Sequence, residues 1–235
     1  MEFLGEVAAW FSDPASWEGR NSIPLRLWEH VSLSATALAL GVLIALPIGL
    51  AIGHSGRGAR SVVAVTNTGR AIPSLGWLGM VLPITLVLFE RGGLGFLPAL
   101  IALVALAIPP IVTNTYAGLR EVDRELIDAA RGMGMSERRI LAAVEVPIAL
   151  PVILAGIRSS AVQVVATATL AAVVAGGTLG DFILQGIFVR DLPRVFGAAL
   201  MVAALALATE GLFALLQRLA TPPGLQGSAA VARPS

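Results

Sequence analysis

The side chains most often used for covalent and metal chemistry are scarce in this sequence. It contains no cysteine, and all 16 of its basic residues are arginine. It therefore lacks thiolate nucleophiles, cysteine metal sites, a Schiff-base lysine and the lysine of a conventional phosphate-binding loop. Neither a Gly-x-Ser-x-Gly elbow nor a His-Glu-x-x-His motif occurs. We therefore expect no catalytic residue in this chain. His30 and His54 are predicted at the edges of apolar segments, as ordinary interface residues without a metal.

Charged side chains concentrate in one stretch, Gly118–Val146, which carries six acidic and five basic residues. Its apolar residues recur at helical spacing up to Ala129 and Ala130, and Gly132 and Gly134 then interrupt the pattern. A second short helix is predicted to begin after Ser136. Such a stretch is either a solvated linker or a docking element, and the small residues and paired glycines favour docking.

The rest of the chain has the composition of a membrane protein. Hydrophobic residues make up 56% and charged residues 13%, and the mean hydropathy is +0.84. Soluble proteins have about 25% charged residues, so lipid is the expected solvent. The net charge of +1 gives no indication of nucleic-acid binding. Five apolar runs are long enough to span a bilayer as helices: Val31–Gly53, Ser61–Phe89 (bent or broken near Pro73), Gly92–Leu119, Pro147–Gly177 and Val195–Leu216.

Polar positions inside these runs are candidates for a translocation pathway, because polarity within lipid is costly. The candidates are the polar residues Asn67, Ser74, Asn114, Thr115, Gln163 and Thr167, together with Pro73 at the helix break. Arg70 and Arg158 are expected to extend their guanidinium groups to the inner membrane surface, and Glu210 to pair with a neighbour or lie near the membrane edge.

Arginine counts predict the orientation of the spans. One alternating set of connections contains nine arginines and the other five. Because cytoplasmic loops are rich in positive residues, the set that includes the stretch 118–147 is expected inside the cell. The N-terminus is then outside and the C-terminus inside. Residues 1–30 are predicted as an extracytoplasmic interfacial segment, either lying on the membrane or packing on the body, and residues 218–235 as a disordered cytoplasmic tail.

The polar stretch resembles the EAA motif of binding-protein-dependent ABC importer permeases. The matching positions are Asp128-Ala129-Ala130, then Gly134, then Val144-x-Val146-Pro147, with Asp in place of the usual Glu and Val in place of Ile and Leu. The resemblance implies that 118–147 is a coupling loop, with Asp128, Ala129, Ala130, Gly134, Val144 and Pro147 docking on a separate ATP-binding subunit. ATP and magnesium would be bound by that partner, and no cofactor by this chain.

Longer segments are similar to permeases for osmoprotectants such as glycine betaine, choline and carnitine. These segments include AIPSLGWLG (Ala71–Gly79), IPPIVTNTYAGLREVD (Ile108–Asp123) and ATATLAAVVAGGTLGDFI (Ala166–Ile183). The resemblance implies an all-α membrane protein with the methionine-importer-type permease fold over residues 31–217, in a bacterial cell membrane. It also implies a second permease subunit, identical or homologous, and an extracytoplasmic substrate-binding protein.

Two alternatives remain open at this stage. One is an importer permease for a different small solute, such as an amino acid or another betaine. The other is a secondary transporter that works without ATP. Secondary transporters commonly show internal repeats and intramembrane ionisable residues. The sequence shows no clear repeat, and Glu210 is the only deep acidic candidate.

Overall fold

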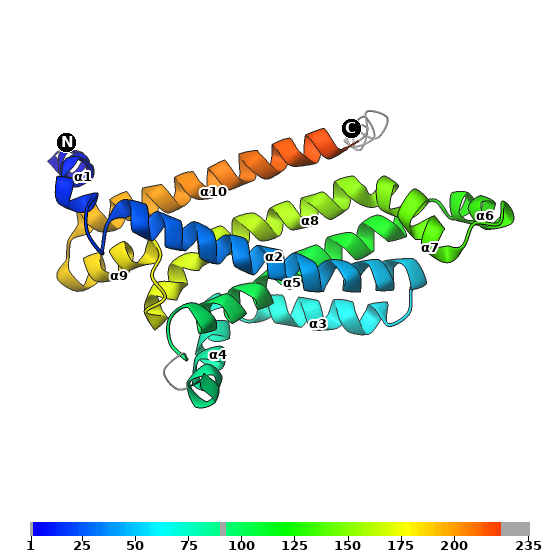
Figure 1. Ribbon diagram of the computed structural model, residues 1–235, viewed down its shortest axis with the longest axis horizontal. Coiled ribbons are helices and arrows are strands. Elements are labelled where there is room, and N and C mark those ends of the chain that lie inside the picture. The colour runs from blue at the N-terminus through cyan, green and yellow to red at the C-terminus, as the bar shows by residue number, and fades with distance from the viewer. Residues whose placement is uncertain (1, 90–92, 222–235) are drawn as a thin grey trace.

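The computed structural model is a bundle of helices (Figure 1). It describes residues 2–89 and 93–221, apart from the side chains of Val63 and Asn67, and no strand occurs in these ranges. The predicted all-α architecture is confirmed. The elements are α1 (Glu2–Ser12), a 3-10 turn (Pro14–Ser16), α2 (Ile23–Ser55), α3 (Ala59–Ala71), α4 (Ser74–Phe89), α5 (Phe96–Arg120), α6 (Arg124–Gly132), α7 (Glu137–Ile140), a π-helical segment η3 (Leu141–Glu145), α8 (Val146–Thr167), a 3-10 segment η4 (Ala168–Val174), α9 (Gly180–Val189) and α10 (Leu192–Ala220).

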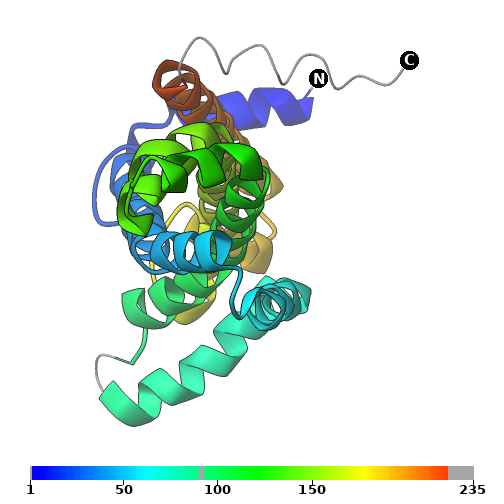
Figure 2. The same ribbon diagram turned by 90° about the vertical axis from the view of Figure 1, so that its right-hand side faces the viewer.

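Four helical segments of the described chain are long and apolar enough to cross a membrane: α2, α5, the segment Glu137–Val174 that contains α8, and α10. The pair α3 and α4 meets the same criterion only when taken together, and it is bent by 97°, as a broken span or a re-entrant loop would be. This break lies at Pro73, as predicted, because the residue before a proline is disfavoured in helical geometry. Figure 2 shows α4 leaving the bundle at a steep angle. The described chain thus has four spans, or five if α3 and α4 form one broken span, which confirms the predicted number of about five.

Several boundaries differ from those predicted. Helix α2 begins at Ile23, so the end of the predicted N-terminal segment 1–30 belongs to the first long helix. Helix α9 was not predicted, and at 10 residues it extends only about 15 Å, too short to cross a bilayer. Helix α10 continues to Ala220, and residues 222–235 of the predicted tail lie outside the described residues.

The two ends of the bundle are different in character (Figure 1). Helices α6 and α7 lie at the end where α2 turns into α3 and where α10 finishes, whereas α1 and α9 lie at the other end. At that other end Trp10 packs edge-on against Phe182, with ring centroids 5.6 Å apart, while Trp28 is 68% exposed. The predicted N-terminal segment therefore packs on the body at Trp10 and leaves the ring of Trp28 largely exposed.

Small residues bring α2 against α5, the central helix of the bundle. A Cβ atom built on Gly41, Gly49 or Gly53 would lie 2.7, 2.6 or 2.8 Å from the Cβ atoms of α5 residues. The opposing residues are Ala107, Thr115 and Leu119. Close approach of this kind lets membrane helices gain van der Waals contact, which replaces the hydrophobic effect as their packing force.

We expect Gly49→Ala to destabilise the chain, because even one methyl group would overlap the Thr115 side chain. Overpacking of a tight contact costs about 1–3 kcal/mol. Thermal unfolding in detergent measures the effect. Gly211→Ala is the matched control, since a Cβ at Gly211 in α10 meets no atom of the described chain within 4 Å. Equal melting temperatures for the two variants would show that the α2–α5 contact has room to adjust.

Candidate functional site: the polar loop and the groove between α8 and α10

The residues 118–147, here called the polar loop, fold into two short helices joined by a tight turn. Asp123 caps α6, its carboxylate accepting a hydrogen bond from the Glu125 amide at 2.9 Å. Gly134 has φ +81°, a left-handed conformation that suits glycine, and the Met135 amide donates to the Ala130 carbonyl at 3.1 Å. Ser136 occupies the N-cap position of α7, as predicted, although its side chain makes no capping bond.

The small residues of the polar loop face in two directions. Ala130 is only 2% exposed and packs with Ile127 and Ile140 inside the chain, whereas Ala129 is exposed. Leu126 and Met133, 51% and 76% exposed, lie three residues before and four after Ala129. This spacing places the three side chains on one face of the helical turn. The stripe Leu126–Ala129–Met133 is therefore an apolar surface available to a partner, and sequence analysis did not identify Met133 as part of it.

Charged side chains hold α6 and α7 together. Arg131 donates from Nε to Glu137 Oε1 at 2.7 Å and from Nη1 to Asp128 Oδ1 at 3.0 Å. The hydrogen bond from Arg131 lowers the pKa of Glu137, and the same pairing raises the pKa of Arg131. A lowered carboxylate pKa means that the pair is intact at neutral pH and is lost only as the pH falls below the usual range of glutamate. Because both side chains are exposed, the pair orients the helices more than it stabilises them.

A histidine connects the polar loop to the first long helix. His54, near the end of α2, contacts the Glu145 carboxylate through Nδ1 and lies 3.3 Å from Glu137 through Nε2. Glu145 closes the π-helical segment, and its side chain is only 3% exposed. His54 is thus more than an interface residue, because it joins α2 to the loop at two carboxylates. His30, also predicted at a loop edge, is instead fully buried within α2, with Nε2 2.9 Å from the Val165 carbonyl oxygen.

The last two motif positions, Val144 and Pro147, are half-buried on either side of Glu145. Val144 packs against the apolar cluster that contains Ile140. Pro147 comes just after the π-helical segment and has no amide hydrogen to donate to the preceding turn, so the regular hydrogen-bond pattern is interrupted where α8 begins. Both residues therefore shape the passage from the polar loop into α8.

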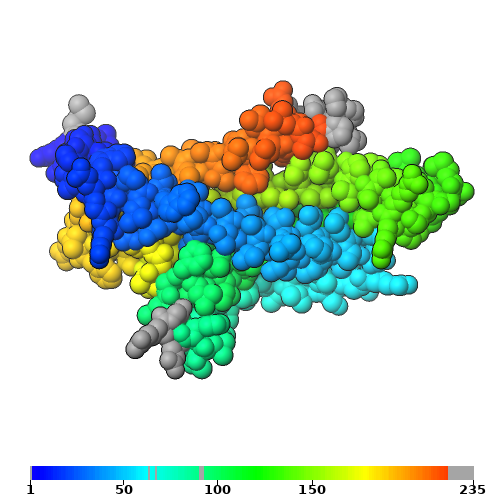
Figure 3. Space-filling view, in the orientation of Figure 1, coloured from blue at the N-terminus to red at the C-terminus, as the bar shows by residue number. Residues whose placement is uncertain are grey.

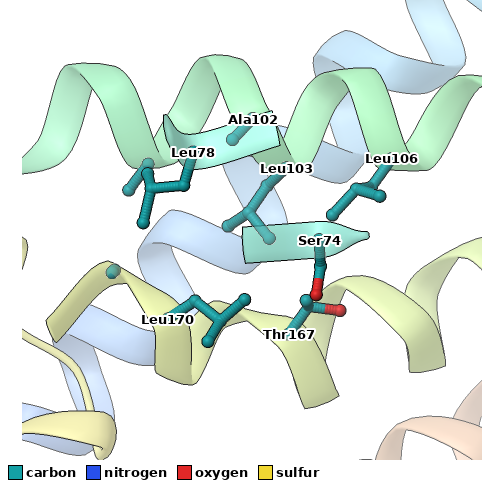
Figure 4. Close-up of a pocket in the computed structure, with 9 residues that line it drawn as sticks. Ser74, Leu78, Ala102, Leu103, Leu106, Thr167 and Leu170 are labelled. Atoms are coloured by element: carbon teal, nitrogen blue, oxygen red, sulfur yellow. The ribbon is translucent and has the colours of Figure 1, made fainter. Parts of the chain in front are cut away.

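Two of the predicted pathway residues meet at a small, partly open cavity. Ser74, at the start of α4, and Thr167, at the end of α8, bring their hydroxyl groups to the same small space (Figure 4). The other lining residues are apolar, and the cavity volume is about 10 Å³, close to the minimum for a single water molecule. Pro73 is exposed at the helix break, and the Asn67 side chain lies outside the described residues.

Asn114 and Thr115 lie at helix crossings. Thr115 is fully buried beneath Gly49, and within the described chain its hydroxyl has no hydrogen-bond partner. Asn114 donates from Nδ2 to the Pro110 carbonyl at 2.8 Å and lies where Gly156 brings α8 close to α5. In this conformation both residues belong to packed contacts between helices.

Gln163 lies elsewhere, on an open groove between α8 and α10 with a volume of about 590 Å³. The groove is lined by Ala155, Arg158, Ser159, Val162, Gln163, Glu210 and Gln217. Arg158 forms an ion pair with Glu210, which confirms the predicted pairing of Glu210. Arg158 therefore turns toward α10, rather than extending alone toward the membrane surface. Arg158 also approaches Gln217, whose Nε2 donates to the Pro151 carbonyl at 2.9 Å.

The opposite end of the bundle carries a second polar cluster. Arg26 in α2 pairs with Glu29 at 2.7 Å and with Asp181 in α9 at 3.0 Å. These contacts fix α9 and the segment before it against the start of α2. Over residues 2–89 and 93–221, no group of three or more histidine, aspartate or glutamate side chains is arranged to hold a metal ion.

The chain resembles known transport proteins over most of its length. Residues 37–221 match the family model described as "Binding-protein-dependent transport system inner membrane component". The chain is 35% identical to the choline transport system permease protein OpuBB of Bacillus subtilis, over 86% of this chain and 89% of that protein. It is 37% identical to the carnitine transport permease protein OpuCB of Listeria monocytogenes, over 89% of this chain and 93% of that protein.

A solved structure shares the fold. An inward-facing form of the MetNI methionine ABC transporter superposes with a TM-score of 0.76 at 23% identity, covering 84% of this chain and 95% of the matched chain. The methionine-importer-type permease fold that the sequence resemblance implied is therefore confirmed.

Proposed function

Because the chain belongs to the family of binding-protein-dependent transport system inner membrane components, we propose that it is the transmembrane subunit of an ABC importer for osmoprotectants. The expected solutes are glycine betaine, choline, carnitine or a similar quaternary amine. The observation that carries this proposal is the 35–37% identity, across nearly the whole chain, to permeases named for choline and carnitine transport. Energy would come from a separate ATP-binding subunit that holds ATP and magnesium, since this chain has no lysine for a phosphate-binding loop.

The two ends of the bundle suit different partners. The polar loop offers the exposed stripe Leu126–Ala129–Met133 to the ATP-binding subunit, while the ion pair between Arg131 and Glu137 helps to orient α6 relative to α7. The opposite end, near Arg26 and α9, would receive an extracytoplasmic substrate-binding protein. The concentration of arginine in the polar loop supports placing it in the cytoplasm of a bacterial cell, with the N-terminus outside and the C-terminus inside.

A second permease subunit would complete the pathway. Apolar side chains of α4 are strongly exposed, among them Val87 at 81% and Leu88 at 66%, so this helix requires lipid or protein around it. Over the described residues, side chains of α5 fill the centre of the bundle in two packed apolar clusters. The passage would therefore form between two such bundles, either identical or homologous.

The proposal is tested by uptake into proteoliposomes. The chain is co-expressed with candidate ATP-binding and substrate-binding proteins from the same genome. Uptake of radiolabelled glycine betaine, choline and carnitine is then followed with and without internal ATP. We expect uptake of at least one of the three that requires ATP. ATP hydrolysis without uptake of any of them would reject the osmoprotectant assignment and favour another small solute. Uptake without ATP would indicate a secondary transporter.

A further inference from the structure

The groove between α8 and α10 contains charges where the surroundings are otherwise apolar. In Figure 3, α10 (orange to red) runs along one edge of the molecule, above α8 (yellow to green). Arg158 lies about 18 Å along the axis of α8 from its start at Val146, and Glu210 about 15 Å from the end of α10. The pair thus lies within the spanning helices, on the stretch of α10 that leads toward Gln217.

This ion pair is only partly covered by the chain. The side chains of Arg158 and Glu210 are 36% and 38% exposed, and the groove beside them is open. Charged groups within spanning helices almost always face a water-filled cavity or the interior of an assembly, because lipid cannot solvate them. Two partly exposed charges on spanning helices therefore fit the pathway side of the bundle better than the lipid side.

The groups that line the groove suit a small molecule with separated charges. A guanidinium binds a carboxylate through two parallel hydrogen bonds, and a carboxylate attracts a quaternary ammonium. Gln163, Ser159 and Gln217 add neutral donors and acceptors, and Ala155 and Val162 supply apolar surface for methyl groups. A zwitterion could separate the Arg158–Glu210 pair and take both partners, so neither charge would be left unpaired.

We propose that the α8–α10 groove is a transient binding site for zwitterionic quaternary amines, in which Arg158 holds the substrate carboxylate and Glu210 its ammonium group. This proposal rests on the proposed function, from which the class of solute is taken. It assigns to Arg158 the discrimination between zwitterions, such as glycine betaine, and cations that lack a carboxylate, such as choline. The affinity is expected to be low, because each substrate charge must compete with the ion pair already present.

Direct binding tests the proposal separately from transport. The permease–ATPase complex, without its substrate-binding protein, is placed in nanodiscs of phosphatidylglycerol, which has no choline headgroup. Thermal-shift titrations with glycine betaine and with choline then compare the wild type with Arg158→Gln and Glu210→Gln. We expect Arg158→Gln to weaken glycine betaine binding about tenfold while choline binding changes much less. Glu210→Gln should weaken both ligands.

Arg60→Gln serves as the control, because it removes an exposed arginine of α3 that does not line the groove. It should leave both titrations unchanged. The proposal is overturned if the wild type gives no response to glycine betaine, or if Arg158→Gln weakens glycine betaine and choline by the same factor, as a purely structural pair would. Loss of transport in the proteoliposome assay, with these binding differences intact, would count against the importer function and not against the site.

Discussion

Ala129→Asp is expected to abolish ATP-driven uptake while the chain still folds and inserts. Ala129 is exposed at the centre of the stripe Leu126–Ala129–Met133, so the new carboxylate lies in water in the free chain. When the ATP-binding subunit docks, the same carboxylate would be buried without a partner. An unpaired charge at a packed interface costs about 3 kcal/mol, which corresponds to roughly a hundredfold weaker association. Co-purification of the ATP-binding subunit and ATP-dependent uptake measure the loss.

The neighbouring alanine provides a contrast within the same helix. Ala130 is buried against Ile127 and Ile140, so Ala130→Asp should unfold the polar loop itself and lower the amount of chain in the membrane. Ala129→Ser, which is small and neutral, should retain both association and uptake. Normal uptake by Ala129→Asp at normal membrane levels would show that the ATP-binding subunit contacts another face of the loop.

The sequence could predict this loop because its signals are local. Helical spacing, the glycines that end α6 and the capping position of Ser136 all act within a few residues, and the structure places them as expected. The long apolar runs likewise determine the spans, since a helix satisfies its backbone hydrogen bonds within one segment, as lipid requires. Composition and periodicity therefore predicted the main helices. They did not predict several helix ends or the short helix α9.

Contacts between distant segments could not be predicted in this way. His54 and Glu145 are 91 residues apart, and Arg158 and Glu210 are 52 residues apart. Nothing in the local pattern around His54 distinguishes it from an ordinary residue at a helix end, and its role depends on how α2 packs beside the loop. The opposite happened at Thr115. Its polar side chain within a span predicted a pathway residue, but the structure buries it fully in a contact between helices.

His54→Ala is expected to weaken the connection between ATP hydrolysis and transport. Glu145 lies at the π-helical segment between α7 and α8, and His54 is the group through which α2 meets it. Removing the imidazole leaves a nearly fully buried carboxylate without this partner, a change that costs about 3 kcal/mol. The segment should then rearrange to expose Glu145, and movement of the polar loop would no longer reach α2. We expect the ratio of solute transported to ATP hydrolysed to fall about tenfold, from simultaneous measurement of both in proteoliposomes.

Two further variants distinguish a role of His54 in coupling ATP hydrolysis to transport from a role in the stability of the fold. His54→Gln keeps a side chain able to donate to Glu145 and should recover most of the ratio. The double change His54→Leu with Glu145→Leu removes the buried charge together with its partner, so the melting temperature should return toward that of the wild type. If the ratio of solute transported to ATP hydrolysed also returns in the double variant, an apolar contact is sufficient and the contact between His54 and Glu145 has no special part in coupling. If stability returns while the ratio stays low, the polar contact between α2 and the loop is what carries the movement of the ATP-binding subunit into the membrane.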